Sequence, residues 1–173
     1  MFKLNRTTEY GLISLRYIHQ RSKSDTAPTV SAREIADLFG LPFEILAKTL
    51  QRLKEVGLIQ STQGAKGGYT IGEKSYSSTM AEYIEWMEGA SHLVPCADTY
   101  TDQYGTIAPS DGLCDFQSKC DIKPHLLELN NEFLTFLKSI PLNRFLNSTN
   151  NPSPFSKINQ PLKGSISNND ATI

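Results

Sequence analysis

Apolar residues recur at helical spacing in the N-terminal part of the chain. Over about 7–20 an apolar stripe predicts a helix, and its members are Leu12, Ile13, Leu15, Tyr17 and Ile18. A second helix is predicted from Ser31, because Ser31 and Glu34 fit the S-x-x-E capping box. Gly40 follows the apolar residues of this helix and provides its C-terminal stop.

A third helix is predicted immediately afterwards, over about 42–57. Its apolar residues repeat at intervals of three, four and three, at Phe43, Leu46, Leu50 and Leu53. Pro42 suits the first turn, where its missing N–H costs little, and Gly57 ends the helix. Two short helices joined by a glycine-containing turn are typical of a helix-turn-helix, although other helical hairpins share the pattern.

The stretch after Gly57, LIQSTQGAKGGYTIG, predicts a strand, a turn and a second strand. Its glycines allow a sharp hairpin, with Lys66 at the tip. A helix-turn-helix followed by a glycine-rich hairpin with a basic tip is a winged helix. In such a domain the second helix of the motif enters the major groove of DNA, and the hairpin contacts phosphates or the minor groove.

The second half of the chain predicts two more helices. One covers 78–89, and the polar stretch 91–121 that follows shows no periodicity. The other begins near Asp121, and its apolar seam has intervals of four and three over Ile122, Leu126, Leu129, Phe133, Phe136 and Ile140. A narrow seam beside a DNA-binding unit favours a homodimer, with packing inside the monomer as the alternative. Pro141 kinks or ends this helix.

These elements predict a mainly α fold with a small β-hairpin. The expected parts are a winged helix-turn-helix DNA-binding domain over 1–75, a connecting helix over 76–90 and a cysteine-containing loop over 91–121. A long C-terminal dimerisation helix is expected over 122–147. The last part, 148–173, is rich in Asn, Ser and Pro and predicts a disordered tail.

Charge is distributed unevenly along the chain. Residues 1–74 carry 11 Lys/Arg and 7 Asp/Glu, which gives +4, and residues 75–173 carry the remaining 6 and 11, which gives −5. The basic first half favours nucleic-acid binding, with ordinary surface variation as the alternative. No apolar run is long enough for a membrane span and the N-terminus does not resemble a signal peptide, so we expect a cytoplasmic protein that does not contact membranes.

Three cysteines, Cys96, Cys114 and Cys120, are the only ones in the chain. They lie in one short polar stretch rather than among core residues, and an odd number in a reducing compartment argues against a disulfide framework. Thiolates are soft ligands that suit iron–sulfur clusters and zinc. The sequence therefore predicts a metal or redox site in this stretch.

The third helix offers an outward face for DNA. The predicted contacts on it are Glu44, Ala47, Lys48, Gln51 and Arg52. A Glu accepts from cytosine N4, a Gln pairs with adenine, and a Lys contacts guanine or phosphate. A solvated helix face is the alternative for any one of them, and the adjacent wing favours DNA contact.

Several segments together resemble a known family. LNRTTEYGLISLRYI, LPFEILAKTLQRLKEVGLIQSTQGAKGGYTI and EWMEG are similar to the Rrf-two (Rrf2) family of bacterial winged-helix regulators, which includes IscR and NsrR. The stretch GLCDFQSKCDIKPHLLELNNEFLTFLKSIPLNRF resembles the SUF-system regulator branch. The resemblance covers roughly 1–147. It implies a homodimeric regulator, a repressor, that binds double-stranded DNA and controls iron–sulfur cluster assembly genes.

The resemblance also implies site residues. Wing contacts to DNA fall on Gln63, Lys66, Gly67 and Tyr69. The three cysteines would hold an iron–sulfur cluster, with 2Fe–2S preferred to 4Fe–4S. A fourth donor is needed, for which His125 is preferred to Glu9 of the partner subunit.

Two features depart from the family pattern. Seventeen residues separate Cys96 from Cys114, which is longer than usual, and Gln63 stands where some relatives carry an arginine. Two rival readings remain, a zinc-stabilised module and a thiol-based redox or nitric oxide sensor without a cluster. An enzyme is not expected, because no nucleophile–base set or phosphate loop stands out in the sequence.

Overall fold

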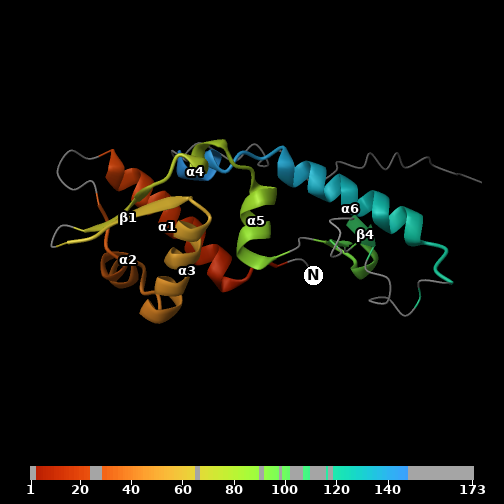
Figure 1. Cartoon of the computed structure of the whole chain (residues 1–173), viewed down its shortest axis with the longest axis horizontal. Helices are drawn as coiled ribbons and strands as arrows, with labels where there is room; N and C mark the ends of the chain where they lie inside the picture. The colour runs from red at the N-terminus through yellow and green to blue at the C-terminus, as the bar shows by residue number, and fades with distance from the viewer. Residues whose placement is uncertain are drawn as a thin grey trace, which may run out of the picture.

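The computed structural model describes residues 3–23, 29–64, 67–89, 92–97, 99–101, 107–109, 116 and 119–147. The architecture is mainly helical with a two-stranded hairpin in its N-terminal half, which confirms the predicted fold class (Figure 1). The predicted tail, 148–173, lies outside the described residues.

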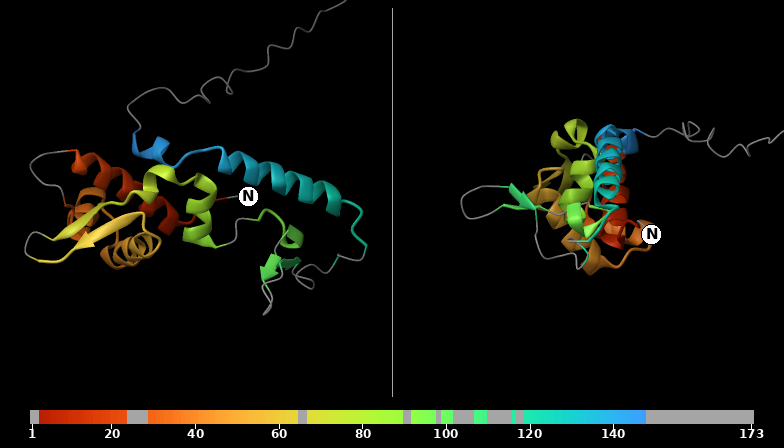
Figure 2. Two further views of the ribbon diagram at one scale, coloured as in Figure 1. Left: turned by 45° about the horizontal axis from the view of Figure 1, so that its top comes forward. Right: turned by 90° about the vertical axis from the view of Figure 1, so that its right-hand side faces the viewer.

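The N-terminal half is a winged helix-turn-helix. Helices α1 (Arg6–Ser22), α2 (Ala32–Phe39) and α3 (Phe43–Glu55) are followed by strands β1 (Ile59–Thr62) and β2 (Gly68–Ile71). The two strands pair antiparallel, with Ile59 opposite Ile71. The hairpin extends beyond the helices at one end of the molecule, as expected for a wing (Figures 1 and 2).

The predicted apolar stripes form one core. Leu15 and Ile18 of α1 are fully buried against Leu46, Leu50 and Leu53 of α3, and helices α1 and α3 are in direct contact. Phe43 was expected in the same stripe, but it is 38% exposed. Its ring lies at the start of α3, where Arg33 of α2 stacks on it with Cζ 4.4 Å from the centroid.

Helix α2 begins where the sequence predicts, but only half of its capping box forms. The Ser31 hydroxyl oxygen accepts the Glu34 backbone N–H at 3.1 Å. The Glu34 carboxylate turns away from the helix end and accepts the Tyr17 hydroxyl at 2.7 Å. This hydrogen bond raises the pKa of Tyr17. Arg21 adds an ion pair to Glu34 at 3.6 Å, so the carboxylate connects α2 to α1.

The wing is fastened to the segment before α2. Val30 and Tyr69 exchange two backbone hydrogen bonds, at 3.0 and 2.8 Å. A Cβ on Gly68 would lie 2.9 Å from the carbonyl oxygen of Val30, so this close approach requires glycine. At the turn, Gly64 adopts a φ of 115°, which L side chains rarely adopt.

Two helices connect the wing to the C-terminal half. A short helix, α4 (Lys74–Ser77), precedes α5 (Met80–Glu88), which corresponds to the predicted helix 78–89. Helix α5 has a complete capping box, since the Thr79 hydroxyl accepts the Glu82 N–H and the Glu82 carboxylate accepts the Thr79 N–H. The Thr79 hydroxyl also donates to Oε2 of Glu82 at 2.9 Å, and the two hydrogen bonds that this carboxylate accepts from Thr79 lower the pKa of Glu82.

The segment after α5 is more ordered than the lack of periodicity indicated. It contains a 3-10 turn, η1 (Pro95–Ala97), and an antiparallel pair of strands, β3 (Thr99–Thr101) and β4 (Ile107–Pro109). The irregular, loop-like stretch expected over 91–121 therefore includes two short strands. Strands of three residues are too short to show an alternation of apolar and polar positions.

The C-terminal region contains two helices. Helix α6 (Lys123–Lys138) ends before Pro141, in agreement with the predicted break, and α7 (Asn143–Leu146) follows. Backbone hydrogen bonds of 2.8 Å from Met80 N–H to Ile140 and from Leu142 N–H to Ser78 tie the break to the start of α5. From this anchor α6 projects away from the winged helix, and its first turn lies at the opposite end of the molecule from the wing (Figures 1 and 2).

Candidate functional site

The outward face of α3 carries the side chains predicted to contact DNA. Glu44, Lys48 and Gln51 are exposed, and Ala47 is half-buried. The Gln51 amide donates to the Glu55 carboxylate at 3.0 Å within the same helix. Since Leu46, Thr49, Leu50 and Leu53 occupy the opposite, buried face, this surface has the amphipathic form of a recognition helix.

Arg52, predicted as a DNA contact, has a partner inside the protein. Its Nε–H donates to the backbone carbonyl oxygen of Trp86 in the last turn of α5. The same tryptophan ring is covered by Lys74, whose Nζ lies 4.1 Å from the centroid. No local pattern indicates the contact between Arg52 and Trp86, because the two residues lie 34 positions apart in the chain.

The wing residues differ in their surroundings. Gln63 is exposed, whereas Gly67 and Tyr69 are half-buried. The Tyr69 ring packs against the core, and its backbone pairs with Val30. Lys66, predicted at the tip, lies outside the described residues.

The last turn of α5 also holds the start of α1. Oε1 of Glu88 accepts the Asn5 backbone N–H at 2.9 Å and the Thr8 hydroxyl at 2.7 Å. One turn earlier, the buried Tyr83 hydroxyl donates to the Thr8 carbonyl oxygen at 2.7 Å, and burial raises the pKa of Tyr83. A Cβ on Gly11 would clash with this hydroxyl, so glycine permits the close packing of α1 on α5.

Two of the three cysteines lie beside α6. Cys96 is in η1 and Cys120 precedes α6, and both are half-buried free thiols. The η1 turn contacts α6, and the Leu93 backbone N–H donates to Oδ1 of the buried Asn130 at 2.9 Å. This hydrogen bond fixes the segment around Cys96 onto one face of α6. The third cysteine, Cys114, lies outside the described residues.

The two predicted fourth donors occupy separate elements. His125 is exposed in the first turn of α6. Glu9 lies in the first turn of α1, where its carboxylate forms an ion pair with Arg6 at 3.1 Å. Within the described ranges, no three side chains of His, Cys, Asp or Glu are brought together as a preformed metal site.

Sequence reasoning overlooked a second histidine near the cysteines, besides His125. His92 lies four residues before Cys96, and its Nδ1 is buried without a hydrogen-bond partner among the described residues. The H-x-x-x-C spacing was visible in the sequence, although only the structure reveals that the ring nitrogen is buried.

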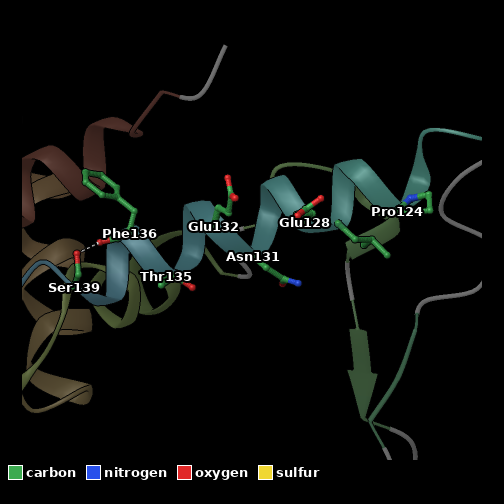
Figure 3. A pocket seen from close by; sticks show the side chains of 8 residues that line it. Pro124, Glu128, Asn131, Glu132, Thr135, Phe136 and Ser139 are labelled. Carbon is green, nitrogen blue, oxygen red and sulfur yellow. Dashed lines mark hydrogen bonds between the residues drawn. The ribbon is translucent and has the colours of Figure 1, made fainter. Parts of the chain in front are cut away.

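Some residues of the predicted seam on α6 face the core, and others face solvent. Phe133 and Ile140 pack against the core, and Leu126 is half-buried. Leu129 is 52% exposed and Phe136 is 48% exposed. Phe136 also borders a shallow groove along the outer side of α6, which Figure 3 shows with Glu128, Asn131, Glu132 and Thr135 along it.

No helix in the described parts of the chain has the length and apolar character needed to cross a membrane.

Comparison with known proteins adds a family. The Rrf2 family model, described as "Iron-dependent Transcriptional regulator", matches residues 4–148. A putative HTH-type transcriptional regulator, rrf2-like, from Rhodobacter capsulatus is 23% identical over 147 residues, which are 85% of this chain and 94% of the relative. The HTH-type transcriptional repressor NsrR of Streptomyces coelicolor is 22% identical over 135 residues, 78% of this chain and 82% of the relative.

Solved structures share the fold. The chain is similar to CymR (YrzC), the global cysteine regulator of B. subtilis, with a TM-score of 0.57 and 20% identity over 86% of this chain and 99% of that one. It is also similar to T. potens IscR, with a TM-score of 0.55 and 20% identity over 84% of this chain and 86% of that one. At these identities the likeness concerns the fold alone.

Proposed function

The chain belongs to the Rrf2 family of iron-dependent transcriptional regulators, and on that premise we propose that it is a cytoplasmic homodimer whose affinity for DNA depends on an iron–sulfur cluster. Family membership makes it a transcriptional regulator and not an enzyme. The observation that carries the cluster proposal is the pair of free, half-buried thiols, Cys96 and Cys120, beside the helix that extends from the winged helix.

For DNA, α3 is the element that enters the major groove. Glu44, Ala47, Lys48 and Gln51 line its outward face, which supports direct contacts to base edges. The wing, with Gln63 and Lys66, reaches the flanking backbone or minor groove. We expect Lys48→Ala to lower affinity and relax base preference in a binding assay against a panel of single-base changes. Equal discrimination by the variant and the parent would remove Lys48 from base recognition.

For the dimer, the exposed strip of α6 is the contact surface. Ile122, Leu129 and Phe136 are 61%, 52% and 48% exposed and recur every seven residues. Side chains separated by seven residues lie on nearly one line along a helix, so a second copy of α6 could cover all three together. A dimer also suits a two-fold symmetric operator, since each subunit would read one half-site.

For the cluster, the proposed ligands are Cys96, Cys114 and Cys120 with one further donor. The described thiols fit this role because neither is consumed in a disulfide and both are half-buried beside α6. The fourth donor proposed from sequence is His125 or Glu9 of the partner subunit. When bound, a cluster would make the state of the protein depend on redox conditions and on the supply of iron. The protein's contribution would be to hold the loop that contains the thiolates against α6.

The test is anaerobic isolation of the full chain, followed by visible spectroscopy and iron and sulfide analysis. We expect Cys114→Ala and Cys120→Ala to lose the chromophore while circular dichroism and sedimentation remain those of the parent. A full iron and sulfide content in both variants would contradict the cluster proposal. Colourless protein that contains zinc would support a structural zinc module instead, and colourless protein without metal would leave a thiol-based sensor.

The proposed targets are genes of iron–sulfur cluster assembly. This follows from the resemblance of the cysteine-containing region to the SUF-system branch. Chromatin immunoprecipitation from iron-replete and iron-starved cells checks it, since occupancy should change at assembly promoters. Occupancy that is unaffected by iron would remove these genes from the proposal.

A further inference from the structure

A pair of exposed side chains, Arg33 and Phe43, lies on the helix-turn-helix outside its hydrophobic core. Arg33 is in the first turn of α2 and Phe43 is the first residue of α3, and Cζ of Arg33 lies 4.4 Å from the centroid of the Phe43 ring. We propose that the pair contacts DNA, where Arg33 binds a backbone phosphate and Phe43 packs against the methyl group of a thymine. The inference deepens the DNA-binding part of the proposed function and does not depend on a cluster.

The guanidinium of Arg33 carries a charge that no acidic side chain pairs with among the described residues. Asp37, one turn later on the same exposed side of α2, forms no ion pair with it. A guanidinium is always charged and has five N–H donors, which remain available for hydrogen bonds while it lies over an aromatic ring. Arg33 therefore has both the charge and the donors that a phosphate group requires.

The place of Arg33 in the motif favours a phosphate over a base. Helix α2 is the first helix of the helix-turn-helix, and α3 is the second. In this motif the first helix crosses the DNA backbone, whereas N-terminal residues of the second helix contact base edges. The Phe43 ring restricts the guanidinium before DNA arrives, so less conformational freedom is lost on binding.

Phe43 lies at the edge of the outward face of α3. Successive residues of an α-helix are rotated by about 100°, so Phe43 is about 40° from Ala47 and about 80° from Gln51, two of the predicted base contacts. On its other side it is about 20° from the buried Leu50. The ring therefore borders the surface that is proposed to enter the major groove, and 38% of the residue remains exposed.

An exposed phenyl ring at this place has one apolar partner on the DNA. A phenyl ring offers no N–H or O–H to a base edge, and the apolar group in the major groove is the C5 methyl of thymine. Contact between the two removes apolar surface of both from water. Since cytosine lacks this methyl group, Phe43 would favour thymine over cytosine at its position, beside the polar contacts of Glu44 and Lys48.

The test uses the full-length protein and a duplex of the sequence that it selects from a random library. Each thymine of this duplex is replaced in turn by deoxyuridine, which lacks only the methyl group. We expect replacement at one position of the half-site to lower the affinity of the parent by about threefold to fourfold, the effect of one methyl-sized group. Phe43→Ala should bind the thymine and uracil duplexes equally there. Phe39→Ala is the matched control, because it removes another exposed ring of the helix-turn-helix, one that contacts Tyr17, and it should keep the preference of the parent.

The phosphate contact is tested by the salt dependence of binding to the same duplex. Arg33→Met removes the charge and leaves an apolar chain beside the ring, so the slope of log K against log salt concentration should fall by about 0.9 for each subunit bound. Lys138→Met is the matched control, since it removes an exposed cation from the last turn of α6, outside the helix-turn-helix. It should leave the slope unchanged.

A measurement on the parent protein covers the case in which Phe43→Ala binds no DNA. Bromodeoxyuridine at the methyl-sensitive position carries a bromine in place of the methyl group and forms a photocrosslink to the side chain that touches it. We expect mass spectrometry to identify the crosslinked residue as Phe43. A crosslink to another residue would overturn the assignment.

The remaining outcomes separate this inference from the proposed function. A thymine preference that persists in Phe43→Ala, a selected site in which no thymine methyl contributes, or an unchanged slope in Arg33→Met would overturn the inference alone, provided that the parent selects a defined sequence. Selection of no defined sequence by the parent would contradict base recognition by α3 as a whole, and the inference would fall with it.

Discussion

Arg52 provides the sharpest test of how the recognition helix is held. It was predicted to contact DNA, but its Nε–H donates to the Trp86 carbonyl oxygen of α5. We expect Arg52→Met to weaken DNA binding by altering the seating of α3, rather than by removing a contact to DNA. The side chain is exposed, so the loss should be close to the typical net contribution of a hydrogen bond, about 1 kcal/mol. This corresponds to about a fivefold loss of affinity.

The assay is DNA affinity measured as a function of salt concentration. A side chain that neutralises a phosphate contributes about 0.9 to the slope of log K against log salt concentration. Arg52→Met should therefore lower affinity with a nearly unchanged slope. Lys66→Ala, which removes one positive charge from the predicted wing tip, is the matched control and should reduce the slope by about 0.9. Emission from Trp86, the only tryptophan in the chain, reports directly on the end of α5.

Two results would refute this reasoning. A slope that falls as much in Arg52→Met as in Lys66→Ala would make Arg52 a phosphate contact. Unchanged affinity together with unchanged Trp86 emission would mean that the hydrogen bond does not influence the position of α3.

Three further predictions concern other parts of the fold. Phe136→Glu should convert a dimer to a monomer in analytical ultracentrifugation without loss of helix content, because the ring is 48% exposed in one subunit; an unchanged dimer would move the interface away from this strip. Tyr83→Phe should lower the free energy of unfolding by about 1–3 kcal/mol in urea titration, because it leaves the Thr8 carbonyl oxygen without its buried donor; a loss below 0.5 kcal/mol, about the error expected for such a measurement, would contradict this. The hydrogen bonds from Thr79 lower the pKa of Glu82 from its ordinary value of 4.5. Their stabilisation is therefore complete above the unfolded-state pKa and is lost as pH falls through the lower folded-state pKa. Glu82→Gln should reduce this acid dependence in melting curves, and an identical pH profile would contradict the assignment.

Sequence patterns predicted the winged helix well because the features that define it involve residues close together in the chain. The apolar repeats of α1 and α3, the Ser31 cap and the glycines of the hairpin each act within a few residues of the chain. Glu34 shows the limit of such reasoning. The capping-box pattern predicts that its carboxylate accepts a hydrogen bond from the backbone at the start of α2. In the structure the carboxylate instead accepts the hydroxyl of Tyr17, which lies 17 positions away in the chain.

The candidate site was harder to predict, because it depends on contacts between distant segments. The cysteines were visible from their spacing, but the docking of the Cys96 segment on Asn130 joins residues 37 positions apart. His92 was overlooked because the burial of its Nδ1 atom is visible only in the structure. The apolar repeat of α6 was visible in the sequence. Which of its residues are buried and which are exposed depends on where α5 packs.

The end of α5 brings these observations together. Within 86–96 the chain contacts the recognition helix through the Trp86 carbonyl, the start of α1 through Glu88, and α6 through Leu93. Coupling between two sites requires an element whose arrangement both sites influence. Under the cluster proposal, a change in ligation at Cys96 would act on residues only eight to ten positions from the contacts that hold α1 and α3. A regulator of this design needs no long-range path through the core. The segment that contains Cys96 follows α5 closely in the chain, and α5 is the helix that contacts α1 and α3.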